Sequence, residues 1–321
     1  MNRQQTSSQD KPRLSESATS TPGPLARPLI IVGTGRCGST IFFEALSHHQ
    51  DFGWLTNYDA KLPRSKLAQL THYARRSKLL DRLLVTEKLQ NRSKWRSGEK
   101  YLIRPEEGYT KWNLLCGRDF GCDYLLNQTA TAEAAQRIRD FFQVVLRKQR
   151  KSRLLIKITG PTRIEYLDSV FPDAQFIHVV RDPCAVANSL MKTVYWQSSL
   201  DHPRWNNGLP DNWEAEWIRH DRSPLALIAI QYRTIMRICA QEVRKIGAQR
   251  YHELTYDQFV DQPIETMNSA LKWANLEHCP NLSQYVATPD RYRNMDFKYQ
   301  KNFTPDQIAM IREIVANDSG A

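Results

Sequence analysis

Three short apolar runs, each about the length of a β-strand, divide the chain into repeating units. They occupy residues 28–32 (PLIIV), 153–159 (RLLIKIT) and 174–181 (AQFIHVVR). Each run is followed by a stretch whose apolar residues recur every three or four positions, which is the period of a helix. Strands that alternate with helices typically form a parallel sheet covered on both faces. The pattern therefore predicts a doubly wound α/β fold.

The remaining apolar pattern is mainly helical. We expect helices over 131–150, over 224–246, from Pro263 and from Pro305, a basic leucine-rich helical stretch over 61–98, and one more short strand at 250–256. The last of these helices has a clear start: Thr304 suits the N-cap, Pro305 the first helical position and Gln307 the capping-box position. Gly247 is expected to end the 224–246 helix.

The composition divides the chain into a tail and one domain. Residues 1–27 are rich in Ser, Thr, Gln and Pro and hold few large apolar groups, so we expect a disordered tail. Residues 28–321 are then the domain, with a helical insertion at about 54–128 on the substrate side. The tail lacks the apolar core of a signal peptide, and we expect no transmembrane segment.

Charge and cysteine content give broader expectations. Lys and Arg number 45 against 34 Asp and Glu, a net charge of +11, which favours an anionic partner but is equally explained by solubility. The six cysteines form no CxxC pair and no zinc-ligand spacing, so neither disulfides nor a metal site is expected. A reducing cytoplasm is the default location.

The sequence GTGRCGST, residues 33–40, lies between the first strand and the first helix, where free N–H groups and the helix dipole favour an anion. It satisfies G-x-G-x-x-G, the pattern of dinucleotide-binding loops. Such a site also needs an acidic residue after a second buried strand, to bind a ribose. The candidate here is Asp51, but it follows SHHQ, which is not a buried strand. It also satisfies half of a Walker A motif, yet Ser39 stands where that motif needs lysine. Neither a dinucleotide site nor an ordinary Mg-nucleotide site fits.

In a third interpretation, the loop's cation is Arg36. A basic residue inside the loop, followed by a glycine and two hydroxyl residues, resembles the 5′-phosphosulfate loop of sulfotransferases that use PAPS (3′-phosphoadenosine 5′-phosphosulfate). The resemblance implies a set of donor-binding residues: Gly35, Arg36, Cys37, Gly38, Ser39 and Thr40. A purely structural glycine turn is the alternative for the loop alone.

A second motif has the same family resemblance. The pattern F-P-x-A-x-F-I-x-x-x-R-D-P begins at Phe171 and includes Arg181, and Ser189 follows on the next helix. It resembles the 3′-phosphate element of sulfotransferases, in which Arg and Ser hold the phosphate that distinguishes PAPS from adenosine phosphosulfate. The two motifs are about 145 residues apart, each at the carboxyl end of a strand, where α/β sheets bind ligands.

The resemblance implies a P-loop-like fold and transfer of a sulfuryl group from PAPS to a hydroxyl or amine of an acceptor such as a carbohydrate, a lipid or a small alcohol. It implies no metal, because fixed cations and a helix N-terminus can stabilise the leaving oxygen. We expect no nucleic-acid partner. The alternatives are a kinase-like phosphotransferase on the same loop and a non-catalytic basic protein that binds polyanions.

Three residues are the catalytic candidates. Arg36 would contact the leaving oxygen, and Lys157, a lysine in an apolar strand, resembles an active-site lysine of some sulfotransferases, although a strand-edge lysine is the alternative. The segment after the first helix lacks the glutamate that related enzymes often use as a base. Glu107, in an E-G-Y-x-x-W stretch, is therefore the first choice for the base, and a solvated surface glutamate is the alternative. The reserve candidates are Asp59, His48 and His49.

Tryptophans are the remaining candidates for binding the acceptor. Most of the eight lie in segments without family resemblance, including Trp95, Trp112, Trp196, Trp205, Trp213 and Trp217. Flat aromatic rings there would stack on an extended acceptor, whereas core packing is the more common role of tryptophan.

Overall fold

The computed structural model describes residues 25–85, 101–117, 120–197, 205–287 and 296–317. Most of the expected tail and the end of the basic leucine-rich stretch lie outside the described residues. So does Trp95.

Five strands form one sheet in the order β2-β3-β1-β4-β5, and every strand pair is parallel. The strands are β1 (Leu29–Gly33), β2 (Phe52–Gly53), β3 (Arg153–Thr159), β4 (Gln175–Val180) and β5 (Tyr251–Thr255). The two strands that carry the family motifs, β1 and β4, are neighbours at the centre. Their carboxyl ends therefore open onto the same edge of the sheet, as a doubly wound α/β fold requires.

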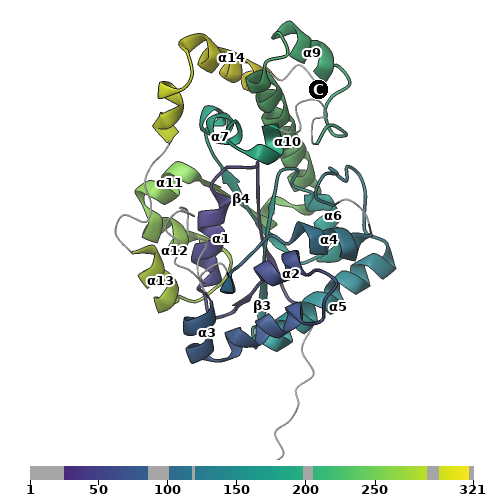
Figure 1. The fold of residues 1–321 in the computed structure, drawn as a ribbon, viewed down its shortest axis with the longest axis vertical. Coiled ribbons are helices and arrows are strands. Elements are labelled where there is room, and N and C mark those ends of the chain that lie inside the picture. The colour runs from purple at the N-terminus through teal and green to yellow at the C-terminus, as the bar shows by residue number, and fades with distance from the viewer. Residues whose placement is uncertain (1–24, 86–100, 118–119, 198–204, 288–295, 318–321) are drawn as a thin grey trace, which may run out of the picture.

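Helices cover both faces of this sheet (Figure 1). The helices that the structure describes are α1 (Ser39–Ser47), α2 (Asn57–Lys61), η1 (Ala68–Arg76), α3 (Lys78–Leu84), α4 (Tyr109–Cys116), α5 (Ala132–Gln149), α6 (Ile164–Val170), α7 (Pro183–Leu190), α8 (Val194–Gln197), α9 (Trp213–Arg219), α10 (Pro224–Ile246), η4 (Ala248–Arg250), α11 (Tyr256–Asp261), α12 (Pro263–Trp273), α13 (Pro280–Val286), η5 (Asp296–Lys301) and α14 (Pro305–Ala316). Figure 1 shows α11, α12 and α13 on one side of the strands and α4, α5 and α6 on the other.

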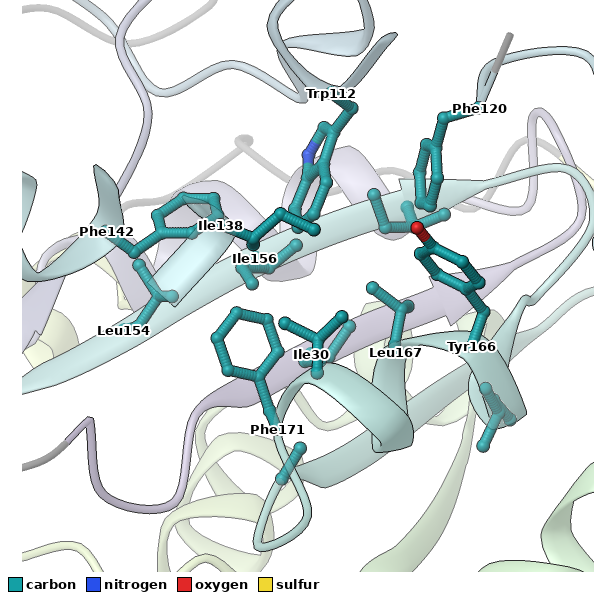
Figure 2. Packing of buried hydrophobic residues seen from close by; sticks show 14 of the residues in the cluster. Ile30, Trp112, Phe120, Ile138, Phe142, Leu154, Ile156, Tyr166, Leu167 and Phe171 are labelled. Carbon is teal, nitrogen blue, oxygen red and sulfur yellow. The ribbon is translucent and has the colours of Figure 1, made fainter. Parts of the chain in front are cut away.

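One face of the sheet is buried by α4, α5 and α6. Ile30 and Ile156 of the strands pack there against Ile138, Phe142 and neighbouring rings (Figure 2). Trp112 stacks on Phe120 with ring centroids 5.0 Å apart. The cluster is rich in aromatic and branched side chains. Their removal from water is the main contribution of this core to the stability of the fold.

The opposite face is covered by α1, α12 and α13. Because successive side chains of a strand point to opposite faces, Ile31, Leu155 and Ile177 belong to this second core. Lys157 stands beside Ile31 in the strand register and shares that face. The strand geometry therefore directs its side chain toward α1.

The expected cap at Thr304 and the expected helix end at Gly247 are confirmed. Asp182 accepts a hydrogen bond from the backbone N–H of Ala185 at the start of α7, and Thr304 forms a capping box with Gln307 at the start of α14. Gly247, with a φ of 89°, ends α10. In the leucine-rich stretch, η1 is a 3₁₀ helix rather than an α-helix. In the part of the chain that the structure describes, no helix is long and apolar enough to cross a bilayer.

Candidate active site

The loop between β1 and α1 has a conformation that its glycine permits. Gly38 lies in the left-handed region with a φ of 92°, and a β-carbon at this position would come within 2.3 Å of the Tyr256 ring. Any side chain there would be both strained and in collision with α11. Arg36 also has a positive φ, 67°, which a non-glycine residue adopts at a cost. The loop is therefore held in one shape by close packing.

The loop is bonded directly to the second motif. The guanidinium of Arg36 donates from Nε to Oγ of Ser189 at 2.9 Å. Arg181 donates from Nη1 to the backbone carbonyl of Arg36 at 3.1 Å. The residues that the sequence assigns to the two ends of the donor thus lie in direct contact.

Arg181 is fixed by groups from three further segments. Its Nε and Nη2 donate to Oδ1 of Asp296 at 2.7 and 2.5 Å. Its guanidinium lies 4.2 Å from the ring centroid of Tyr256, within the range of a cation–π contact. Its backbone carbonyl accepts a hydrogen bond from the phenol of Tyr232 at 2.8 Å. These contacts fix the position of Arg181.

Lys157 contacts both the loop between β1 and α1 and the candidate base, Glu107. Its side chain is 3% exposed, and its ammonium donates to Oγ1 of Thr40 at 2.9 Å. The same nitrogen lies 2.7 Å from Oε1 of Glu107. This lysine points into the site and is not at a sheet edge.

Glu107 is held at the carboxyl end of β3. Its side chain is 18% exposed, and the hydroxyl of Thr159 lies 3.4 Å from both carboxylate oxygens. The phenol of Tyr109 donates to the carbonyl of Thr159 and accepts from its N–H, each at 2.7 Å. Burial raises the pKa of Tyr109, so its phenol stays protonated and can make both bonds. Tyr109 and Thr159 thereby fix the position of the carboxylate.

The segment that carries Glu107 lies beside the segment that follows α1 and β2. The N–H of Glu106 donates to the carbonyl of Leu55 at 2.9 Å, and the N–H of Asn57 donates to the carbonyl of Arg104 at 3.0 Å. A glutamate from a distant part of the sequence is thus brought next to the loop after β2.

The reserve candidates have other contacts. Asp59 is buried and bonded to Thr56 and to His72. Burial would raise the pKa of Asp59, but these hydrogen bonds and the His72 charge outweigh it and hold the pKa below its usual range. His49 is buried against the carbonyl of Glu277 at 2.9 Å, and His48 stacks on Tyr285. The two histidines adjoin the end of α1 that is far from the loop.

Cys37 is part of the loop, but its thiol faces inward. Its side chain is fully buried, and burial raises the pKa of the thiol despite the positive charges of Lys157 and Arg181. The thiol therefore stays neutral and packs inside the loop.

Most tryptophans that the structure describes pack into the protein. Trp112, Trp196 and Trp217 are buried, and Trp213 is half-buried beside Trp217. Trp205 lies against Gly160, which follows β3.

Several residues of the site carry no motif that marks them. Tyr109 stands inside the E-G-Y-x-x-W stretch, but the sequence gives its side chain no role. Thr159, Tyr232 and Asp296 lie in unremarkable sequence and become visible only through their contacts.

The site suits a polyanion. Arg36, Lys157 and Arg181 converge at the carboxyl ends of β1, β3 and β4, next to the N-terminus of α1, whose free N–H groups favour anions. Among the residues that the structure describes, no group of three His, Cys, Asp or Glu side chains is arranged to hold a metal.

Fold and site together are those of an α/β protein with a cationic site at the carboxyl ends of its central strands. The family model described as "Sulfotransferase family" matches residues 28–280. This chain belongs to the sulfotransferase family.

Among curated proteins, the chain is 28% identical over 180 residues to the omega-hydroxy-beta-dihydromenaquinone-9 sulfotransferase Stf3 of Mycobacterium tuberculosis (strain CDC 1551 / Oshkosh), and equally to Stf3 of Mycobacterium bovis. The alignment covers 54% of this chain and only 41% of either relative.

Among solved structures, sulfotransferase STF9 from Mycobacterium avium aligns with a TM-score of 0.56 and 18% identity, covering 92% of this chain and 78% of that one. Mouse sulfotransferase SULT7A1, complexed with PAP, aligns with a TM-score of 0.41 and 10% identity, covering 92% and 86% of the two chains. The likeness to STF9 shows a shared fold.

Proposed function

We propose that the protein transfers a sulfuryl group from PAPS to a hydroxyl of its acceptor. One observation carries the proposal: the Lys157 ammonium contacts both Thr40 of the loop and Glu107. A cation beside both the loop and a carboxylate can stabilise the leaving oxygen next to a group that accepts the proton of a hydroxyl.

In the proposed reaction, the acceptor oxygen attacks sulfur while the bond from sulfur to the 5′-phosphate oxygen breaks. The acceptor proton passes to Glu107, and PAP leaves with the electron pair of the broken bond. Arg36 and Lys157 stabilise the negative charge that grows on the leaving oxygen, and Thr40 and the start of α1 hold the 5′-phosphate.

The donor's 3′-phosphate is assigned to Arg181 and Ser189. Arg181 directly follows β4, Ser189 lies on α7, and both contact Arg36 of the loop. A nucleotide that spans both elements would therefore have its two charged ends bound by neighbouring side chains.

The proposed acceptor to test first is a lipid alcohol. Stf3 is named for a hydroxylated menaquinone, and 28% identity over 180 residues supports a related acceptor class. An ω-hydroxylated isoprenoid quinone, a sugar and a short aliphatic alcohol form a suitable panel.

The experiment is to incubate the protein with PAPS and each acceptor and to follow PAP release and a product mass gain of one sulfuryl group. ATP with Mg²⁺ serves as the comparison donor. The proposal predicts sulfation that persists in EDTA, with Lys157→Ala inactive. Phosphorylation from ATP, with no product from PAPS, would instead establish the kinase-like alternative.

A further inference from the structure

The carboxylate of Asp296 is bound to the edge of the Arg181 guanidinium that best suits bidentate binding. Oδ1 of Asp296 accepts from both Nε and Nη2, and both side chains are only 11% exposed. Nη1 donates to the Arg36 carbonyl. The Nε–Nη2 edge, which arginine uses to bind carboxylates and phosphates as a fork, is therefore already engaged.

The surroundings of this pair are rich in negative charge. Asp257 of α11 lies close enough that it joins burial in raising the pKa of Asp296, against the lowering effect of Arg181. Asp182, next to Arg181 in the chain, caps α7. A phosphate added to Arg181 would face the carboxylate of Asp296, and like charges in a half-buried site repel.

The element that carries Asp296 is anchored elsewhere. Asn302, just after η5, donates to the side chain of Asn188 at 2.8 Å, and Asn188 is adjacent to Ser189 on α7. Tyr299 is buried and bonded to Arg312 of α14. Asp296 is the first residue of η5, so its side chain can leave Arg181 while the rest of the element stays packed on α7.

We propose that Asp296 competes with the donor's 3′-phosphate for Arg181, so that nucleotide binding replaces one anion with another on the same guanidinium. This inference rests on the proposed function, because it takes Arg181 as the 3′-phosphate ligand. Asp296 therefore weakens nucleotide binding. It also speeds the release of PAP, because it re-forms its ion pair with Arg181 as PAP leaves.

The test is calorimetry of PAP and 5′-AMP binding to the wild-type protein, Asp296→Asn and Arg181→Ala. Asp296→Asn removes the competing charge and keeps the size of the side chain. PAP affinity should therefore rise about tenfold, which is the effect expected when one competing charged interaction is lost. Affinity for 5′-AMP, which lacks the 3′-phosphate, should change less than about twofold. Stopped-flow release of PAP should slow by a similar factor.

The outcomes separate the inference from the function on which it rests. Weaker PAP binding by Asp296→Asn would show that Asp296 positions Arg181 for the phosphate, and unchanged binding would show no coupling; either overturns the inference. Arg181→Ala without effect on PAP affinity would overturn the donor-site assignment itself. Asp296→Glu, which keeps the charge, is the second variant: it should retain PAP affinity nearer to the wild type than Asp296→Asn does.

Discussion

The Ser189 hydroxyl accepts a hydrogen bond from Arg36, a residue 153 positions earlier in the chain. Ser189 belongs to the helix after β4, and Arg36 belongs to the loop after β1. The shared bond brings the proposed binding sites for the 3′- and 5′-ends of the donor together, so changes at one end should affect the other.

The donor preference is the first prediction. PAP should bind much more tightly than 5′-AMP in isothermal calorimetry, and Arg181→Ala should remove most of that difference, because a charged hydrogen bond contributes about 1.5–3 kcal/mol. Ser189→Ala should have a smaller effect in the same direction. Equal affinity of the wild-type protein for PAP and 5′-AMP contradicts the prediction.

Lys157 should act mainly on the chemical step. Negative charge on the leaving oxygen grows toward the transition state, so Lys157→Ala should lower turnover by about a hundredfold or more, and PAP affinity by much less. Steady-state kinetics and calorimetry on the same preparations separate the two effects. Lys272→Ala, an exposed lysine on α12, is the control. A loss confined to affinity removes Lys157 from the catalytic set.

Glu107 should be the general base. Glu107→Gln keeps the size of the side chain and its bond to Lys157 but cannot accept the proton, so turnover should fall at least about a hundredfold. Thermal melting and PAP affinity should stay near normal. Glu106→Gln is the matched control, since Glu106 shares the loop and the charge. The assignment fails if Glu107→Gln stays active while Asp59→Asn or His48→Gln is inactive.

His178 should make stability sensitive to acid. Burial lowers its pKa to about 4 from its usual 6.5, so between these values the unfolded chain binds a proton that the folded protein does not. Stability should therefore fall as the pH falls through this window, by about 2 kcal/mol between pH 7 and pH 5. Urea unfolding at both pH values should show a smaller loss for His178→Gln. Identical losses in both proteins mean that other groups cause the acid sensitivity.

The fold was largely predictable because its signals are local. The apolar runs of β1, β3 and β4 and the cap at Thr304 depend on a few adjacent residues. The 3₁₀ form of η1 was not predictable, because apolar residues three apart fit either helix type.

The site was predictable only where a motif marks it. Arg36, Lys157 and Arg181 stand in recognisable stretches, and the structure brings them together. The Asp296 contact with Arg181 joins residues 115 positions apart and depends on how η5 packs against α7, which no local pattern encodes. The positioning of Glu107 by Tyr109 and Thr159 likewise arises from tertiary packing.

The strand order has a consequence for how the protein is made. β1 is the first strand of the sheet to be synthesised, yet both of its neighbours, β3 and β4, follow more than a hundred residues later. During translation, β1 therefore emerges as an apolar segment with unpaired edges, and such segments aggregate readily. Pairing across so long a stretch of chain also requires a costly loop closure, which slows folding. Expression at low temperature, or with a chaperone that shields β1, should accordingly raise the yield of folded protein.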